Sequence, residues 1–122
     1  MNDTKTVNKK FKKELNSGSV ALILLSVMGR AAEPMYGYQI AKLIGVGGAD
    51  VPLVKQGALY PVLRSLEKSD LLQSQVEPSV SGPPRRYYSI TEFGNETLQQ
   101  WVEIWSHTKT FVDSILEGAY HD

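Results

Sequence analysis

The fold is decided by residues 55–68, which read KQGALYPVLRSLEK. The apolar side chains of this stretch follow the i, i+3, i+4, i+7 spacing of one helical face, and they are Leu59, Val62, Leu63 and Leu66. Pro61 is compatible with this helix if the helix starts near Gly57, because a first-turn N–H has no acceptor within the helix. The stretch therefore predicts an amphipathic helix with one face on a core. The other face carries cations and no acid, so it is free to meet an anion.

Two helices are predicted before this stretch. Residues 17–32 form a largely buried helix that ends at Glu33-Pro34, because proline disfavours helical geometry in the residue before it. A shorter helix follows, and its apolar stripe consists of Tyr36, Ile40, Leu43 and Ile44. The lysine-rich residues 1–16 form either a flexible arm or the start of the first helix. The glycine-rich connection at residues 45–54 is expected to be irregular.

A hairpin and a last helix are predicted after it. Leu71–Glu77 and Arg86–Ile90 favour β structure, and they pair around a loop that Gly82-Pro83-Pro84 stiffens. Thr91 is the predicted N-cap of the final helix, with Glu92 in the first turn, where the helix dipole favours an acid.

The final helix carries a heptad pattern. Apolar or small residues recur at alternating steps of three and four, at Leu98, Trp101, Trp105, Thr108, Val112, Ile115 and Ala119. No other predicted helix is long enough to match this seam, so we expect the chain to form a homodimer. The expected interface residues are Leu98, Trp101, Trp105, Val112, Ile115 and Ala119.

Composition narrows the class of protein. A chain of 122 residues with 42% apolar and 21% charged residues is a globular chain of one domain. The net charge is zero, yet residues 1–86 hold 12 basic and 7 acidic residues and residues 87–122 hold 1 and 6. This asymmetry is expected when one part meets nucleic acid, the alternative being two solvated faces of opposite sign. Without cysteine, a membrane-length apolar stretch or a signal peptide, the expected location is cytoplasmic.

An enzyme is the main class that the sequence argues against. The two histidines, His107 and His121, have no cysteine, second histidine or Ser/Asp constellation nearby. The stretch Gly45-Val46-Gly47-Gly48 lacks the preceding strand and the lysine of a nucleotide loop. We therefore expect no catalytic residues, no metal and no cofactor.

Three helices, a hairpin with a basic tip and a long last helix define a winged helix-turn-helix with a C-terminal dimerisation helix, in a mostly α member of the α+β class. The polar face of the third helix would enter the DNA major groove, which is about 12 Å wide. The residues expected to contact DNA are Lys55, Gln56, Tyr60, Arg64, Ser65, Lys68, Arg85 and Arg86. Among them, Gln56, Tyr60 and Ser65 are best placed for base edges, and the cations, with the lysines of residues 1–16, for phosphates.

Three ordered motifs resemble the PadR family of bacterial transcription regulators. The sequence YGYQI at residues 36–40 is similar to the family's second-helix signature, and GALYPVLRSLE at residues 57–67 is similar to its recognition helix. GPPRRYYSITEFG at residues 82–94 is similar to its wing, last strand and entry to the final helix. The resemblance covers about residues 18–118 and implies a repressor that binds double-stranded DNA at an inverted-repeat operator.

The single last helix resembles the smaller branch of this family, some members of which bind flat aromatic drugs between their subunits. The resemblance implies an effector site at the dimer centre, and the residues assigned to it are Trp101, Trp105 and Thr108. Two indoles across a two-fold axis would form a slot for a planar ligand, and Glu103 and Asp113 would favour a cationic one if they line it. The alternative is that both tryptophans only pack the dimer core.

The sequence divides into a basic arm or helix start (1–16), a winged helix-turn-helix (17–91), a dimerisation helix (92–118) and a frayed tail (119–122). Ser69-Asp70 stands where the family has a glycine after the recognition helix, and aspartate adopts that left-handed conformation at some cost. Gly82-Pro83-Pro84 replaces a Gly-Gly turn in the wing. Two other functions stay open: a winged-helix adaptor that binds protein instead of DNA, and a DNA-binding regulator without an effector.

Overall fold

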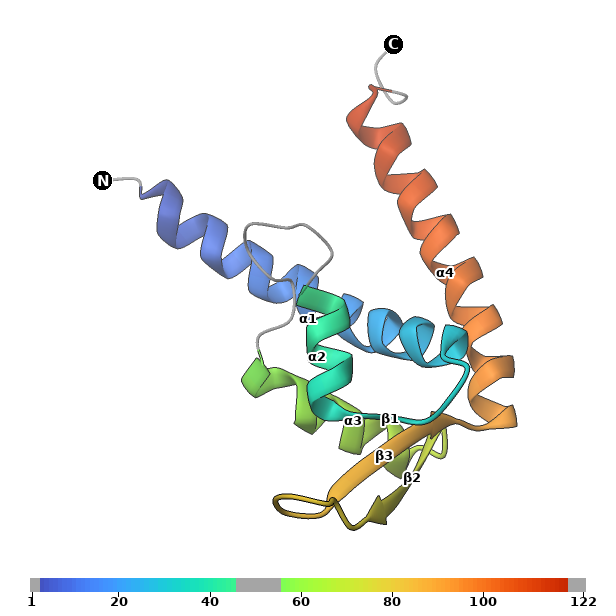
Figure 1. Ribbon diagram of the computed structural model, residues 1–122. Coiled ribbons are helices and arrows are strands. Elements are labelled where there is room, and N and C mark those ends of the chain that lie inside the picture. The colour runs from blue at the N-terminus through green and yellow to red at the C-terminus, as the bar shows by residue number, and fades with distance from the viewer. Residues whose placement is uncertain (1–2, 46–55, 119–122) are drawn as a thin grey trace.

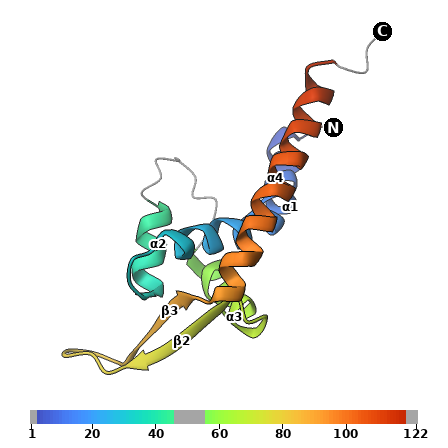
Figure 2. The same cartoon turned by 90° about the vertical axis from the view of Figure 1, so that its right-hand side faces the viewer.

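The computed structural model describes residues 3–45 and 56–118, and this part of the chain folds into four helices and a three-stranded sheet (Figures 1 and 2). The elements in chain order are α1 (Thr4–Arg30), β1 (Met35–Tyr36), α2 (Gly37–Gly45), α3 (Gln56–Lys68), β2 (Leu72–Glu77), β3 (Arg85–Ile90) and α4 (Glu92–Leu116). The fold is the mostly helical winged helix with a long last helix that the sequence predicts. The expected connection, apart from Gly45, and the expected tail lie outside the described residues.

Helix α1 begins at Thr4, well before the Ser17 of the sequence prediction. Asp3 caps it: its carboxylate accepts hydrogen bonds from the backbone N–H of Lys5 at 3.0 Å and from the hydroxyl of Thr6 at 2.6 Å. Of the two alternatives for residues 1–16, the structure therefore has the start of the helix from Thr4 onward. The helix ends at Arg30, two residues before the predicted end, and Pro34 follows in the turn to β1.

The core lies where α1, α2, α3 and the sheet meet. Its most fully buried side chains are Leu24, Leu25, Met28, Ile40, Leu59, Leu63 and Leu72. The stripe predicted for α3 is confirmed, with Leu59, Leu63 and Leu66 buried and Val62 half-buried. Pro61 lies within α3 but beyond its first turn, because the helix begins at Gln56. Because proline has no N–H, one backbone carbonyl in the preceding turn lacks its helical donor. Pro61 is exposed, so this carbonyl faces the solvent.

The sheet has the order β1-β3-β2, and all of its pairings are antiparallel. The hairpin of β2 and β3 is confirmed, with Leu72 opposite Ile90 and Glu77 opposite Arg85. Strand β1 was not predicted, and the prediction that Tyr36 lies on the stripe of the second helix is wrong, since Tyr36 pairs with Tyr87 in the sheet. Leu43, predicted on the same stripe, is 55% exposed.

The end of α3 turns the chain directly into β2. Asp70 has φ 65°, and its N–H donates to the carbonyl of Glu67 at 2.9 Å, while the N–H of Leu71 donates to the carbonyl of Leu66 at 2.9 Å. This is the Schellman arrangement, which usually places glycine at the left-handed position. The left-handed aspartate expected from Ser69-Asp70 is therefore confirmed.

Helix α4 starts from the same corner of the molecule. The Thr91 hydroxyl accepts from the N–H of Gly94 at 2.9 Å and donates to the carbonyl of Asp70 at 2.6 Å, so the predicted N-cap also contacts the end of α3. Gly94 lies against the carbonyl of Leu71, where a Cβ would overlap the oxygen. Farther along, α4 crosses α1 where Leu98 lies over Gly29, and beyond this crossing the two long helices diverge away from the wing (Figures 1 and 2).

Candidate nucleic-acid interface

The exposed face of α3 presents the side chains that the sequence assigned to DNA. Tyr60, Arg64, Ser65 and Lys68 are all exposed, while the leucines on the other side of the helix are buried. Arg64 and Lys68 lie one turn apart, and no hydrogen bond or ion pair within residues 3–45 and 56–118 engages either cation. This face can therefore bind an anion without first breaking an internal interaction.

Tyr60 also has a packing role. Its ring lies against Gly37, the first residue of α2, and a Cβ at that glycine would be 2.8 Å from the Cζ and the hydroxyl oxygen of the ring. Gly37 is buried, and Tyr60 is 39% exposed. The residue expected to contact base edges thus joins α3 to α2 as well.

The wing is a hairpin whose loop is fixed by its own hydrogen bonds. Gly82 has φ 116°, and the Ser79 hydroxyl lies 2.9 Å from its carbonyl and 3.0 Å from that of Pro83, to which it can donate. Left-handed glycine and two prolines together restrict the backbone of the loop. The strands beneath present Arg85 and Arg86, both exposed.

The two wing arginines are held on opposite faces of the sheet. The guanidinium of Arg85 lies 4.5 Å from the centre of the Tyr36 ring, which in turn meets the ring of Tyr87 edge-on at 5.3 Å. The Nη1 of Arg86 donates to the Ser74 hydroxyl at 2.9 Å on the face that packs against α3. Arg86 is therefore the wing cation on the same side as the recognition helix.

Tyr88 lies buried beneath this junction. Burial raises the pKa of its phenol, and the negative charge of Glu67 adds to the rise, while the positive charges of Arg86 and Arg64 oppose it. The opposing influences place cations from both α3 and β3 near one phenol.

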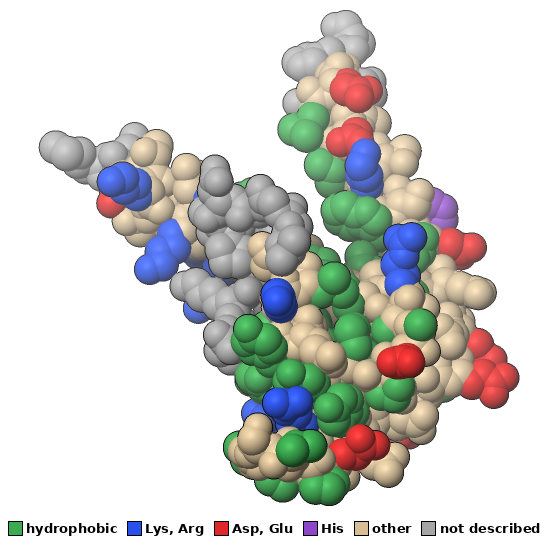
Figure 3. Space-filling model, viewed as in Figure 1, with side chains coloured by type: hydrophobic (Ala, Val, Ile, Leu, Met, Phe, Trp, Pro, Cys, Tyr) green, Lys and Arg blue, Asp and Glu red, His purple; other side chains and the backbone are tan. Residues whose placement is uncertain are grey.

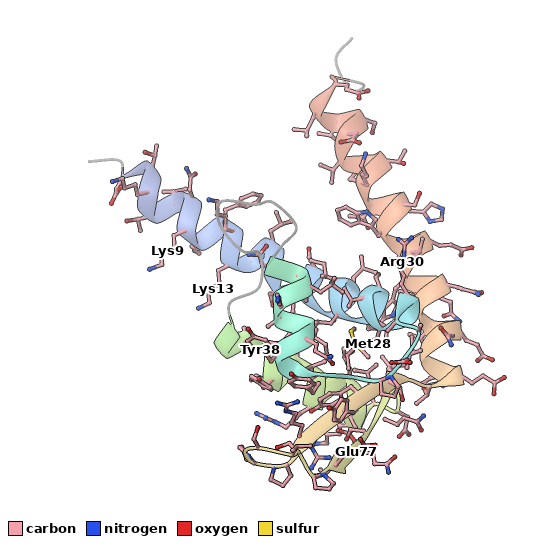
Figure 4. The ribbon with its side chains drawn as sticks, in the orientation of Figure 1. Lys9, Lys13, Met28, Arg30, Tyr38 and Glu77 are labelled. Carbon is pink, nitrogen blue, oxygen red and sulfur yellow. The ribbon has the colours of Figure 1, made fainter. Side chains whose placement is uncertain are left out.

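The lysines near the N-terminus lie on a part of α1 that extends beyond the core. Lys9 and Lys13 project from this part on the side away from α4 (Figure 4), and the space-filling view shows blue patches along it (Figure 3). The apolar residues Val7, Phe11 and Leu15 recur every four positions on the same segment, and each is more than half exposed. This half of α1 is therefore a basic amphipathic helix whose apolar side chains are exposed in the part of the chain that the structure describes.

The residues assigned to an effector site are divided between two environments. Trp101 is half-buried and packs with Leu98 against the core of its own chain, whereas Trp105 is 45% exposed and Thr108 is exposed. Part of the predicted dimer seam is thus used within the chain. Asp113 is paired with Lys109 at 2.9 Å.

The apolar surface of α4 is wider than the heptad seam predicted. Val112 and Ile115 of that seam are 45% and 39% exposed. Ile104, Phe111 and Leu116, which the predicted seam does not include, are at least 61% exposed. Hydrophobic side chains follow the side of α4 that faces the diverging half of α1 (Figure 3). Helix geometry places Glu103 on the opposite side of α4 from Val112, away from this surface.

Some candidate residues fall outside the description. Lys55, Ala119 and the side chain of Gln56 lie outside the part of the chain that the structure describes. Conversely, Tyr36 and Ser74, which contact the wing arginines, and Glu67, which accepts from Ser74, are not among the predicted site residues. Strand alternation could have placed Ser74 and Arg86 on one face, but only the strand register brings them within hydrogen-bond distance.

A shallow groove of about 230 Å³ lies on the other face of the sheet, and its lining includes Gln73, Gln75, Tyr87 and Ser89. It contains neither Trp101 nor Trp105.

No helix in the described parts of the chain combines the length and apolarity that crossing a membrane requires.

The fold and the cationic face together define a winged helix-turn-helix transcriptional regulator, and comparison with known proteins gives the family. Residues 24–100 match the model of the "Transcriptional regulator PadR-like family". The chain belongs to this family, whose members are DNA-binding transcription factors, as the motifs around Tyr36, Arg64 and Arg86 indicated.

Solved structures agree with this assignment. A PadR family transcriptional regulator from Eggerthella lenta is 30% identical, with a TM-score of 0.80 over 94% of this chain and 96% of that one. A PadR-like regulator from Bacillus cereus is also 30% identical, with a TM-score of 0.67 over 86% of this chain and 98% of that one. An uncharacterized protein of Lysinibacillus sphaericus is 31% identical over 83 residues, which are 68% of this chain and 76% of the relative.

Proposed function

We propose that this chain is a homodimeric repressor that reads an inverted-repeat operator in double-stranded DNA with α3 and its wing. The observation that carries the proposal is the exposed pair of cations Arg64 and Lys68 on α3, neither of them in an ion pair within the described residues, with Arg86 on the same side of the adjoining sheet. In a two-fold dimer, two such helices would enter successive major grooves about 34 Å apart. Repression is carried over from the family resemblance, and a bacterial operator implies action in the cytoplasm.

Dimerisation is supported by the unpartnered apolar side chains on α4. A helix of 25 residues is about 37 Å long, and among the described residues the half that extends beyond the core leaves large apolar side chains such as Phe111 and Leu116 exposed. Burying side chains such as Phe111 and Val112 against a second copy would remove them from water. Two DNA-binding faces would then be held at a fixed separation.

Binding to the DNA upstream of the protein's own gene tests the proposal, by fluorescence anisotropy at two salt concentrations. Arg64→Ala should weaken binding several-fold and reduce the salt dependence by about one counterion, because it removes one phosphate contact. Arg30→Ala is the matched control, since Arg30 is an exposed cation at the end of α1, beside α4 (Figure 4). Equal binding by both variants would remove Arg64 from the interface, and no specific binding by the unaltered protein would favour the protein-binding adaptor.

A planar aromatic or cationic effector at the dimer centre is supported by Trp105, whose indole is 45% exposed on the apolar side of α4. Titration with planar cationic dyes should quench tryptophan fluorescence in the unaltered dimer. Trp105→Ala should abolish dye binding while sedimentation still shows a dimer. Unchanged quenching in this variant would leave a DNA-binding regulator without this effector site.

A further inference from the structure

A chain of three side chains joins the recognition helix to the wing. Ser74, half-buried on β2, donates its hydroxyl to Oε2 of Glu67 at 2.5 Å, and Glu67 lies in the last turn of α3. The same hydroxyl accepts from Nη1 of Arg86 on β3 at 2.9 Å. One serine therefore contacts both the recognition helix and a wing arginine.

Strand register explains why Arg86, and not Arg85, takes part. Ser74 lies opposite Tyr88 and Val76 lies opposite Arg86, so Ser74 and Arg86 are diagonal neighbours on one face of the sheet. Arg85 points to the other face, where Tyr36 holds its guanidinium. The two arginines are thus oriented independently.

Glu67 is unexpected on a surface that meets phosphate. A carboxylate there repels DNA, and in the described structure no direct ion pair offsets it. Its half-buried position and its short contact to Ser74 indicate that its partner lies within the protein. A charged acceptor also strengthens the hydrogen bond that a hydroxyl donates to it.

We propose that Glu67 and Ser74 are positioning residues that hold the Arg86 guanidinium on the side of the sheet that packs against α3, so that α3 and the wing present their cations together to DNA. The inference rests on the proposed function and adds which residues orient the wing. Loss of the Ser74 hydroxyl leaves every formal charge in place, so any change in affinity reports orientation and not net charge.

The first test is a double-mutant cycle on DNA affinity. Ser74→Ala should weaken binding by roughly 3- to 10-fold, the equivalent of one hydrogen bond. In an Arg86→Ala background, the same substitution should have no further effect, because the arginine that it orients is gone. Ser74→Thr, which retains a hydroxyl on a β-prone residue, should bind as the unaltered protein does.

Ser89→Ala is the matched control, because it removes a hydroxyl from the same sheet on the opposite face, where Ser89 meets Gln73 at 3.4 Å. It should not change affinity. Glu67→Ala supplies a test of sign: removal of an acid near DNA strengthens binding if only net charge matters, whereas loss of the positioning contact weakens it. Stronger binding by Glu67→Ala, or an equal effect of Ser74→Ala with and without Arg86, would overturn the inference.

A measurement without DNA separates this inference from the proposed function. Relaxation of the Arg86 Nε–H in NMR should report an ordered guanidinium in the unaltered protein and a mobile one in Ser74→Ala, with circular dichroism confirming that both are folded. Ordered Arg86 in both proteins would overturn the inference alone. A protein that binds no DNA would overturn the proposed function, and with it the role of Arg86 at DNA.

Discussion

Gly94 is the residue with the least space for a side chain. A Cβ there would overlap the carbonyl oxygen of Leu71. The backbone of Gly94 belongs to α4 and that of Leu71 leads into β2, so neither can move without shifting its element. We expect Gly94→Ala to lower the free energy of unfolding by about 1–3 kcal/mol or more, measured by urea denaturation. Gly18→Ala is the control: nothing lies within 4 Å of its added Cβ, and it should raise helix stability by up to about 1 kcal/mol. Equal urea midpoints for Gly94→Ala and the unaltered protein would contradict the close approach.

Asp70 is the residue at which a substitution should improve stability. Its φ of 65° strains an L side chain, and its backbone makes the required hydrogen bonds whatever the side chain is. Asp70→Gly should raise the free energy of unfolding by roughly 0.5–1 kcal/mol, visible as a Tm higher by a few degrees. Asp70→Ala keeps the strain and should not show this gain, so a shared increase would point to charge instead of backbone conformation.

Tyr88 should make the fold sensitive to high pH. Its pKa is raised in the folded state by burial, so the neutral phenol is favoured there. The stability that this pKa difference contributes is fully present below the unfolded pKa of about 10 and is lost as the pH rises through the folded pKa. The Tm should therefore fall above about pH 10, and Tyr88→Phe should reduce that fall because phenylalanine does not ionise. An unchanged alkaline profile in Tyr88→Phe would assign the loss to other tyrosines.

Among the elements, α4 depends on the hydrogen bonds of its N-cap residue, Thr91. Thr91 caps the helix at Gly94 and also donates to the carbonyl of Asp70, so Thr91→Ala removes two interactions. We expect a loss of about 1–2 kcal/mol in the free energy of unfolding. Thr91→Ser retains the hydroxyl and should lose much less, as chemical denaturation can show; equal losses would mean that the threonine methyl group matters more than the cap.

The sequence predicted the elements that bury a periodic face and missed those that do not. The stripe from Leu59 to Leu66 is visible because α3 packs on the core, and the cap at Thr91 has a local signature. The first half of α1 buries no apolar residue, so its apolar residues at every fourth position did not decide between a flexible arm and a helix start. Strand β1 consists of two residues, which are too few to show a period. The wing cations were predicted by type, but their partners depend on strand register, which is a property of the folded chain.

At the scale of the whole molecule, the proposed dimer depends on one side of α4. Val112→Glu places a charge on its apolar side and should convert the dimer to a monomer at micromolar concentration, because an unpaired buried charge is costly. Thr110→Glu is the matched control, since it adds the same charge two residues away on the opposite side of the helix. Sedimentation velocity distinguishes the two, and identical profiles would place the interface elsewhere.

The corner formed by Asp70, Leu71 and Thr91 has a mechanical consequence. The backbone that ends α3 also accepts the hydroxyl that starts α4, and Gly94 presses against the same short segment. These contacts join the end of α3 directly to the start of α4, so a tilt of α4 would rotate α3 with it. Because α4 is about 37 Å long, a small change in its angle displaces its far end considerably. In the proposed dimer, such a change would shift the two copies of α3 out of alignment with successive major grooves of DNA.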